Sequence, residues 1–147
     1  MSYGLAPYGS ALYGGPMVAS PPAQTDTTLQ VELSLAGALA SPVWVDITSD
    51  VRWFDTTRGR NRELERVQPG RATIVLSNLS RQYDSANPSS PYAGHLKPMR
   101  RIRIRETFNG VTYPLFDGYV DRWVLDYPGV GKDAIATVVA TDAFKIF

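Results

Sequence analysis

The segment RRIRIRETFNGVTYPLF, residues 100–116, alternates arginine with isoleucine, reaches an Asn-Gly pair, and continues as a second run rich in apolar residues. Successive side chains of a strand point to opposite faces, so arginine on one face and isoleucine on the other is typical of a half-buried antiparallel strand. Asn109-Gly110 is the strongest short-range hairpin signal and fits a two-residue type I′ turn. The segment therefore predicts a hairpin whose return strand covers residues 111–116.

Strand patterns continue on both sides of this hairpin. Apolar side chains recur with a period of two, between Gly- and Pro-rich turns, in residues 29–35, 43–48, 72–77, 119–125 and 134–140. Val51 and Trp53 continue or bend the second of these strands, and Asp117-Gly118 predicts a bulge or a second turn. The run at 72–77 is apolar on both faces, which favours an internal strand. One weak helix signal follows Thr141 or Asp142.

The strand count and the frequent turns predict an all-β fold, a small antiparallel β-barrel or sandwich. Residues 78–99 contain three prolines, one glycine, and Asn, Asp and Ser residues. We expect them to form a long irregular loop, and a loop of this length inside a compact domain usually serves a function or an interface.

The N-terminal segment has a different character. Tyr-Gly pairs begin at Tyr3, Tyr8 and Tyr13, a five-residue spacing that matches neither helix nor strand. Two interpretations stay open: a docking arm that uses the tyrosines as anchors, and a low-complexity tail. The predicted organisation is an extended arm and linker over residues 1–28 and a β-domain over residues 29–147.

Composition narrows the function classes. The chain has 147 residues, 44% of them hydrophobic and 20% charged, which is enough for a packed core. It has no cysteine and one histidine, His95, so thiolate chemistry and a histidine metal cluster within one chain are excluded. No apolar run approaches the roughly 18 residues of a membrane span. We expect a protein that is not an enzyme and that carries no catalytic, cofactor or metal site.

Charge is segregated along the chain. The net charge of +1 divides into −4 over residues 1–57, +8 over residues 58–105 and −3 over residues 106–147. A basic middle between acidic flanks can complement itself within the fold or between copies of the subunit.

The basic residues form two groups. Arg101, Arg103 and Arg105 share one strand face, which leaves three interpretations: a phosphate-binding groove, an ion-paired subunit interface or a solvated face. Arg58, Arg60 and Arg62 lie in a predicted charged hairpin or loop, either a solvated turn or a subunit contact. These six arginines and the three tyrosines of the Tyr-Gly pairs are the candidate subunit-interface residues.

Aromatic and acidic residues give a weaker signal. Trp53, Tyr119 and Trp123 would form a carbohydrate-binding face if they were aligned and exposed, and Tyr119 and Trp123 share a face of the predicted strand. Asp117 and Asp121 would lie about 13 Å apart along a strand, farther than a glycosidase pair allows. Structural roles fit these residues better.

Residues 44–147 resemble a known family. The resemblance is carried in order by WVDITSDVRWF, RGRNRELERVQPGRATIVLSNLSRQYD, NPSSPY, LKPMRRIRIR, YPLFDGYVDRW and ATVVATDAFKIF, over about two-thirds of the chain. Together these motifs resemble the N-terminal domain of minor tail proteins of long-tailed bacteriophages, especially phages of actinobacteria. Proteins of this type usually continue well beyond the equivalent of the last motif, so the chain is either a short tail protein or part of a longer one.

The resemblance implies a structural component of the tail tip or baseplate, in which a β-barrel-like domain assembles as a ring that continues the tail tube and organises the host-facing end. Its implied partners are copies of itself, with a trimer favoured over a hexamer, and neighbouring tail-tube and baseplate proteins. The implied location is the virion tail, after synthesis in the host cytoplasm. Gly70, Leu76 and Gly118 carry over as fold-defining positions, and no catalytic residue carries over.

A different function class remains as the alternative. In that alternative the chain is a small β-barrel that binds nucleic acid through the face that carries Arg100 to Arg105.

Overall fold

A computed structural model describes residues 27–59, 68–129 and 133–146, and these residues form an all-β fold, as predicted. The strands are β1 (Thr27–Ser34), β2 (Trp44–Asp46), β3 (Val51–Gly59), β4 (Gln68–Ser77), β5 (Arg101–Phe108), β6 (Val111–Asp126) and β7 (Ile135–Asp142). Two short 3-10 helices, η1 (Thr48–Asp50) and η2 (Ala143–Ile146), complete the described elements, and the second stands where the sequence indicated a terminal helix.

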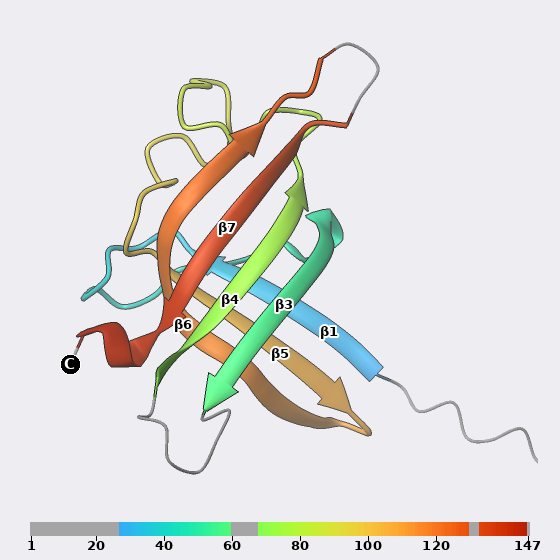
Figure 1. Cartoon of the computed structure of the whole chain (residues 1–147), viewed down its shortest axis with the longest axis vertical. Helices are drawn as coiled ribbons and strands as arrows, with labels where there is room; N and C mark the ends of the chain where they lie inside the picture. The colour runs from blue at the N-terminus through green and yellow to red at the C-terminus, as the bar shows by residue number, and fades with distance from the viewer. Residues whose placement is uncertain (1–26, 60–67, 130–132, 147) are drawn as a thin grey trace, which may run out of the picture.

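All seven strands belong to one antiparallel sheet with the order β2-β1-β5-β6-β7-β4-β3. Strand β6 is long enough to belong to two layers, since its first part pairs with β5 and its second part pairs with β7. Figure 1 shows the result, with β1 and β5 crossing behind β3, β4 and β7. The end strands β2 and β3 do not pair with each other in the described sheet, which is therefore an open barrel or sandwich.

Gly118 lies where β6 passes from one layer to the other. A Cβ atom there would lie 2.3 Å from the carbonyl oxygen of Thr141 and 2.7 Å from the ring of Phe116, so only glycine fits. The strand runs unbroken through Asp117-Gly118, and its register shifts between Val120 and Arg122. The predicted second turn is therefore absent. Register shifts lie on both sides of the pair instead, at Leu115 against β5 and at Asp121 against β7.

The bulge at Asp121 exchanges the two faces of β6. Phe116 and Val120 point into the core before it, and Trp123 and Leu125 pack against the core after it. An extra residue in one strand of a pair shifts the alternation by one position. The prediction that Tyr119 and Trp123 share a face is therefore wrong.

The core lies between the two layers. Its fully buried members are mainly aliphatic side chains from strands of both layers, among them Val31, Leu33, Ile74, Leu76, Ile102, Ile104, Phe116 and Val138. Ile102 and Ile104 are completely buried while the arginines between them lie on the opposite face, as their alternation predicted.

The structure confirms the predicted hairpin. Phe108 pairs with Val111, and Asn109 and Gly110 have φ angles of 48° and 78°, the positive values that a type I′ turn requires. Strand β4 lies between β3 and β7 and is therefore internal, as expected.

Strand β3 differs from the prediction. Helix η1 separates it from β2, so Val51 and Trp53 do not continue the preceding strand. Strand β3 extends to Gly59 and pairs antiparallel with β4, so Arg58 lies in a strand, which fits the hairpin and not the loop of the two predicted alternatives. Gly70 and Leu76 both lie in β4.

Residues 78–99 contain no helix or strand, but they are regularly folded. Every third residue from Arg81 to Ala93 donates its backbone N–H to the carbonyl three positions earlier, which produces a series of five tandem turns. Tyr83 and Leu96 bury their side chains in the core and anchor the loop to the sheet.

The arm predicted over residues 1–28, with Tyr3, Tyr8 and Tyr13, falls almost entirely outside the described residues. Within the described ranges, no helix is both long and apolar enough to cross a membrane.

Candidate functional site

The three arginines of β5 lie on its outer face, between β1 and β6. The register places Arg103 opposite Glu32 on one side and Asp117 on the other. Arg103 donates to both carboxylate oxygens of Glu32, at 2.6 and 3.0 Å, and Arg105 donates to Glu32 at 2.6 Å and to Gln30 at 2.9 Å. All three guanidinium groups have a carboxylate partner, because Arg101 pairs with Asp117 at 2.9 Å.

Trp44 of β2 covers part of this arginine face. The guanidinium carbon of Arg103 lies 4.0 Å from the centroid of the indole ring, and that of Arg101 lies 5.7 Å from it. Cation–π contact strengthens when the cation is partly shielded from water, as it is for Arg103 beside the buried Glu32. The arginine face is therefore a packed, ion-paired layer.

Glu32 is the electrostatic centre of this layer. The residue is only 7% exposed, yet the hydrogen bonds and charge of Arg103, with a smaller contribution from Arg105, lower its pKa against the opposing effect of burial. Glu32 is therefore ionised at neutral pH. Sequence reasoning missed this carboxylate because it lies 71 positions before Arg103 and becomes adjacent only through the β1–β5 register.

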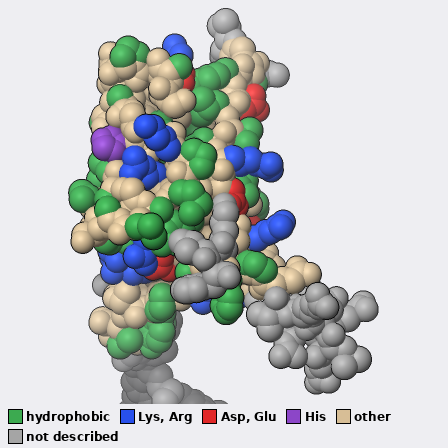
Figure 2. All heavy atoms as spheres, turned by 90° about the vertical axis from the view of Figure 1, so that its left-hand side faces the viewer, with side chains coloured by type: hydrophobic (Ala, Val, Ile, Leu, Met, Phe, Trp, Pro, Cys, Tyr) green, Lys and Arg blue, Asp and Glu red, His purple; other side chains and the backbone are tan. Residues whose placement is uncertain are grey.

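The second basic group is divided. Arg58 is exposed at the end of β3 and donates to the carbonyl of Pro114 at 3.3 Å, whereas Arg60 and Arg62 lie outside the described residues. On the face shown in Figure 2 the Lys and Arg side chains form separate groups with other side chains between them, not one continuous basic groove.

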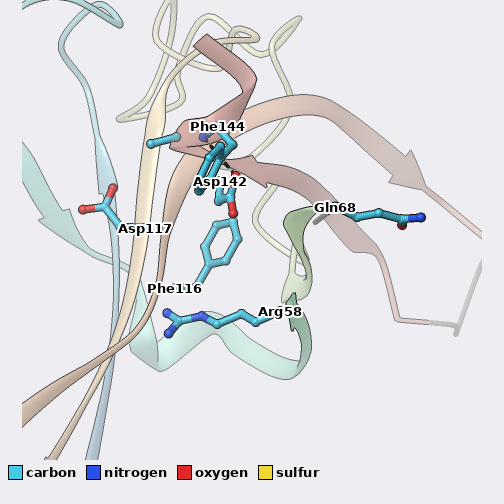
Figure 3. A pocket seen from close by; sticks show the side chains of 7 residues that line it. Arg58, Gln68, Phe116, Asp117, Asp142 and Phe144 are labelled. Carbon is cyan, nitrogen blue, oxygen red and sulfur yellow. Dashed lines mark hydrogen bonds between the residues drawn. The ribbon is translucent and has the colours of Figure 1, made fainter. Parts of the chain in front are cut away.

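Arg58 also lines a pocket of about 400 Å³ at the end of the sheet where η2 begins (Figure 3). Phe116, Phe144 and Ala143 supply apolar walls, and Asp117, Asp142 and Gln68 supply polar groups. Asp142 accepts the backbone N–H of Gly70 at 2.6 Å and that of Phe144 at 3.0 Å, which explains why the strand ends and η2 starts there. The pocket has the size and lining to hold a side chain from another protein segment.

An aromatic cluster joins the long loop to the sheet. The ring of Tyr83 stacks on Tyr92 at 5.3 Å and on Trp123 at 6.1 Å between centroids. The Tyr83 hydroxyl donates to Asp50 at 2.6 Å, and burial raises the pKa of Tyr83 far above its usual range. A polar group buried in this way must be hydrogen-bonded, so Asp50 fixes the position of the loop.

The aromatic residues do not form the exposed row that carbohydrate binding would need. Trp123 packs against the core within this cluster, Tyr119 is 9% exposed, and Trp53 lies on β3 with 54% exposure. Among the described residues no group of three His, Asp or Glu side chains is placed to hold a metal ion.

Comparison with known proteins found similarity to solved structures but not to known sequences. No family model matches the chain, and no curated protein sequence matches it. Among solved structures, the chain is similar to the 43 kDa tail protein of prophage MuSo2 from Shewanella oneidensis, with a TM-score of 0.33 and 16% sequence identity. The match covers 78% of this chain and 28% of the tail protein, so the chain corresponds to less than a third of that protein's length.

Proposed function

We propose that this chain is a structural, non-enzymatic component of a bacteriophage tail, located at the tail tip or baseplate, and that it acts by assembling into a ring with copies of itself. The observation that carries the proposal is that the motifs of the phage-tail resemblance come together in space. Asp50, Tyr83, Tyr92 and Trp123 belong to four separate motifs and form one stacked, hydrogen-bonded cluster. The resemblance therefore covers a structural unit and not scattered similarities.

The open sheet supports assembly by edge contacts. A closed ring of more than two copies needs a heterologous contact, in which two different surfaces of the subunit meet. Strands β2 and β3 end the sheet and are different in length and sequence, so the molecule offers two different edges. In this proposal the Tyr-Gly arm attaches to an adjacent subunit or tail protein, and a side-chain pocket such as the one beside Arg58 suits such an attachment.

The ion pairs of the arginine face limit what these arginines can contribute to contacts in the ring. Arg101, Arg103 and Arg105 already have partners within the chain, so they contribute a fixed surface and leave one positive charge beyond the two carboxylates. Contact through these residues would therefore depend on shape as much as on charge.

The test uses particles of a phage whose genome encodes the chain. Mass spectrometry of purified, disassembled tails should detect it, and averaged particle images should show it as a ring with threefold or sixfold symmetry at the tail tip. Absence of the chain from purified particles would overturn the proposal. Its presence without a ring would overturn the assembly mechanism.

A further inference from the structure

One layer of the fold consists of β3, β4, β7 and the second part of β6, and its outer face has no partner within the described residues. Strand pairing arranges it in two rows that cross β3, β4, β7 and β6. One row is Trp53, Val75, Thr137 and Val124, and the next is Asp55, Thr73, Val139 and Arg122. We call these eight residues the outer patch. The outer surface of this layer faces the viewer in Figure 1, where β3, β4 and β7 lie in front of β1 and β5.

We propose that the outer patch binds the outer patch of a second copy of this chain, in a pair with twofold symmetry. The first support is its apolar composition. Trp53 is 54% exposed and Val124 is 45% exposed, and both belong to the same row, with Val75 between them in partial exposure. A sheet face with β-branched and aromatic side chains can pack on another sheet, as the inner faces of β-sandwiches do.

The second support is charge. Asp55 and Arg122 stand at opposite ends of one row, and neither has an ion-pair partner among the described residues. By contrast, Arg52, Arg101, Arg103 and Arg105 are all paired within the chain. The opposite charges of the outer patch are separated by the spacings between four adjacent strands, about 14 Å in total.

This separation is what a twofold pair requires. A rotation of 180° about an axis parallel to the strands, between β4 and β7, reverses the order of the strands and keeps the rows in place. Asp55 of each copy then faces Arg122 of the other, and Trp53 faces Val124. One surface thus supplies two ion pairs and two apolar contacts, with no like charges opposed within the patch.

The pair is a contact separate from the proposed ring, because the ring contact is heterologous and this one is isologous. The two proposals do not depend on each other, so either can fail alone. The patch is small, since each row spans about 14 Å across the strands and the two rows lie about 7 Å apart along them. We therefore expect a reversible pair that forms in the micromolar range and not an obligate dimer.

The experiment measures the mass of the complete chain by sedimentation velocity over a range of concentrations. Asp55→Arg and Arg122→Asp should each weaken pairing by at least about tenfold, because each places like charges opposite one another twice. The double variant should recover pairing. An equimolar mixture of the two single variants should also pair, because one then carries arginine at both positions and the other carries aspartate at both, so that unlike copies are complementary.

Controls separate this result from loss of folding. Glu106→Arg reverses a charge on the other layer and should leave pairing unchanged, and all variants should keep the circular dichroism spectrum and unfolding midpoint of the parent chain. Trp53→Ser should weaken pairing, whereas Val111→Ser, at an exposed position on the β5–β6 hairpin, should not. A parent chain that does not pair at any concentration, or single variants that pair as well as it does, would overturn the proposal.

Discussion

At Gly118 a single hydrogen atom in place of a side chain allows the two layers to form. Strand β6 passes so close to β7 that a Cβ atom would overlap the backbone of Thr141 and Asp142. Backbone atoms of a paired strand cannot move aside as a flexible side chain can. The glycine is therefore needed for space and not for an unusual backbone conformation.

Gly118→Ala is expected to lower the free energy of unfolding by about 3 kcal/mol, because overpacking forces backbone shifts. Urea denaturation measures the effect. Gly37→Ala is the matched control, since no atom lies within 4 Å of its Cβ position, and it should change stability by less than about 0.5 kcal/mol. Equal stability of the two variants would show that β6 does not pass as close to β7 as described.

Glu32 links stability to pH. Its pKa is lower in the folded chain than in the unfolded chain, so the unfolded state binds more protons as pH falls. The stabilisation is complete above the unfolded pKa of about 4.3 and is lost as pH falls through the lower folded value. Glu32→Gln should cost about 2 kcal/mol at pH 7. The cost should be smaller at pH 3, below the unfolded pKa, because the unfolded carboxyl group is protonated there and the ionised, paired form then contributes less to stability.

Denaturation of both proteins at pH 7, 5 and 3 measures this difference. Glu106→Gln is the control, because Glu106 belongs to the neighbouring strand β5 and forms no ion pair among the described residues. A stability difference for Glu32→Gln that is the same at all three pH values would contradict the assigned ion pairs.

At the scale of elements, a buried hydroxyl helps to hold the loop of residues 78–99 on the sheet. Tyr83→Phe keeps the stacked ring but leaves Asp50 without its 2.6 Å hydrogen bond. We expect the free energy of unfolding to fall by about 1.5 kcal/mol. We also expect the substitution to accelerate amide hydrogen exchange more in the loop than in β4. Tyr113→Phe, at a half-exposed position on β6, should have no such effect. Unchanged loop exchange in Tyr83→Phe would show that the loop does not need the Tyr83 hydroxyl.

Strand β5 tests the nucleic-acid alternative. Because Arg101, Arg103 and Arg105 are each paired with a carboxylate, we expect no measurable binding of a random single-stranded oligonucleotide at about 50 mM salt. Fluorescence anisotropy of a labelled oligonucleotide measures it. Binding that falls steeply with salt and disappears in the triple alanine variant would support a nucleic-acid function instead.

Prediction of elements succeeded where the signal was local. The Asn109-Gly110 turn, the alternation of Ile102 and Ile104 and the internal β4 are properties of neighbouring residues, and the structure confirms them. Strand β3 and the unbroken β6 were missed, because pairing with β4 and β7 decides where those strands begin, bend and end. A bulge has no fixed sequence signature, so the face assignment of Trp123 was wrong.

At the scale of the whole molecule, the arm and the β-domain are expected to be separable. Deletion of residues 1–22 should leave the unfolding midpoint of the domain within about 2 °C, because the described sheet starts only at Thr27. The same deletion should prevent incorporation into particles if the arm attaches the subunit to its neighbours. Incorporation at the parent level, measured by mass spectrometry of purified particles, would remove the arm from the assembly mechanism.

The sequence by itself determined the all-β class, the hairpin and the identity of the core face, because alternation and turn chemistry act between residues that are close along the chain. Only the tertiary structure decided which polar side chains come together in pairs or rows. Glu32 and Arg103, Tyr83 and Asp50, and the row from Asp55 to Arg122 are joined by strand register and by the bend at Gly118. Register depends on how all the strands pack together, and therefore no local pattern contains it.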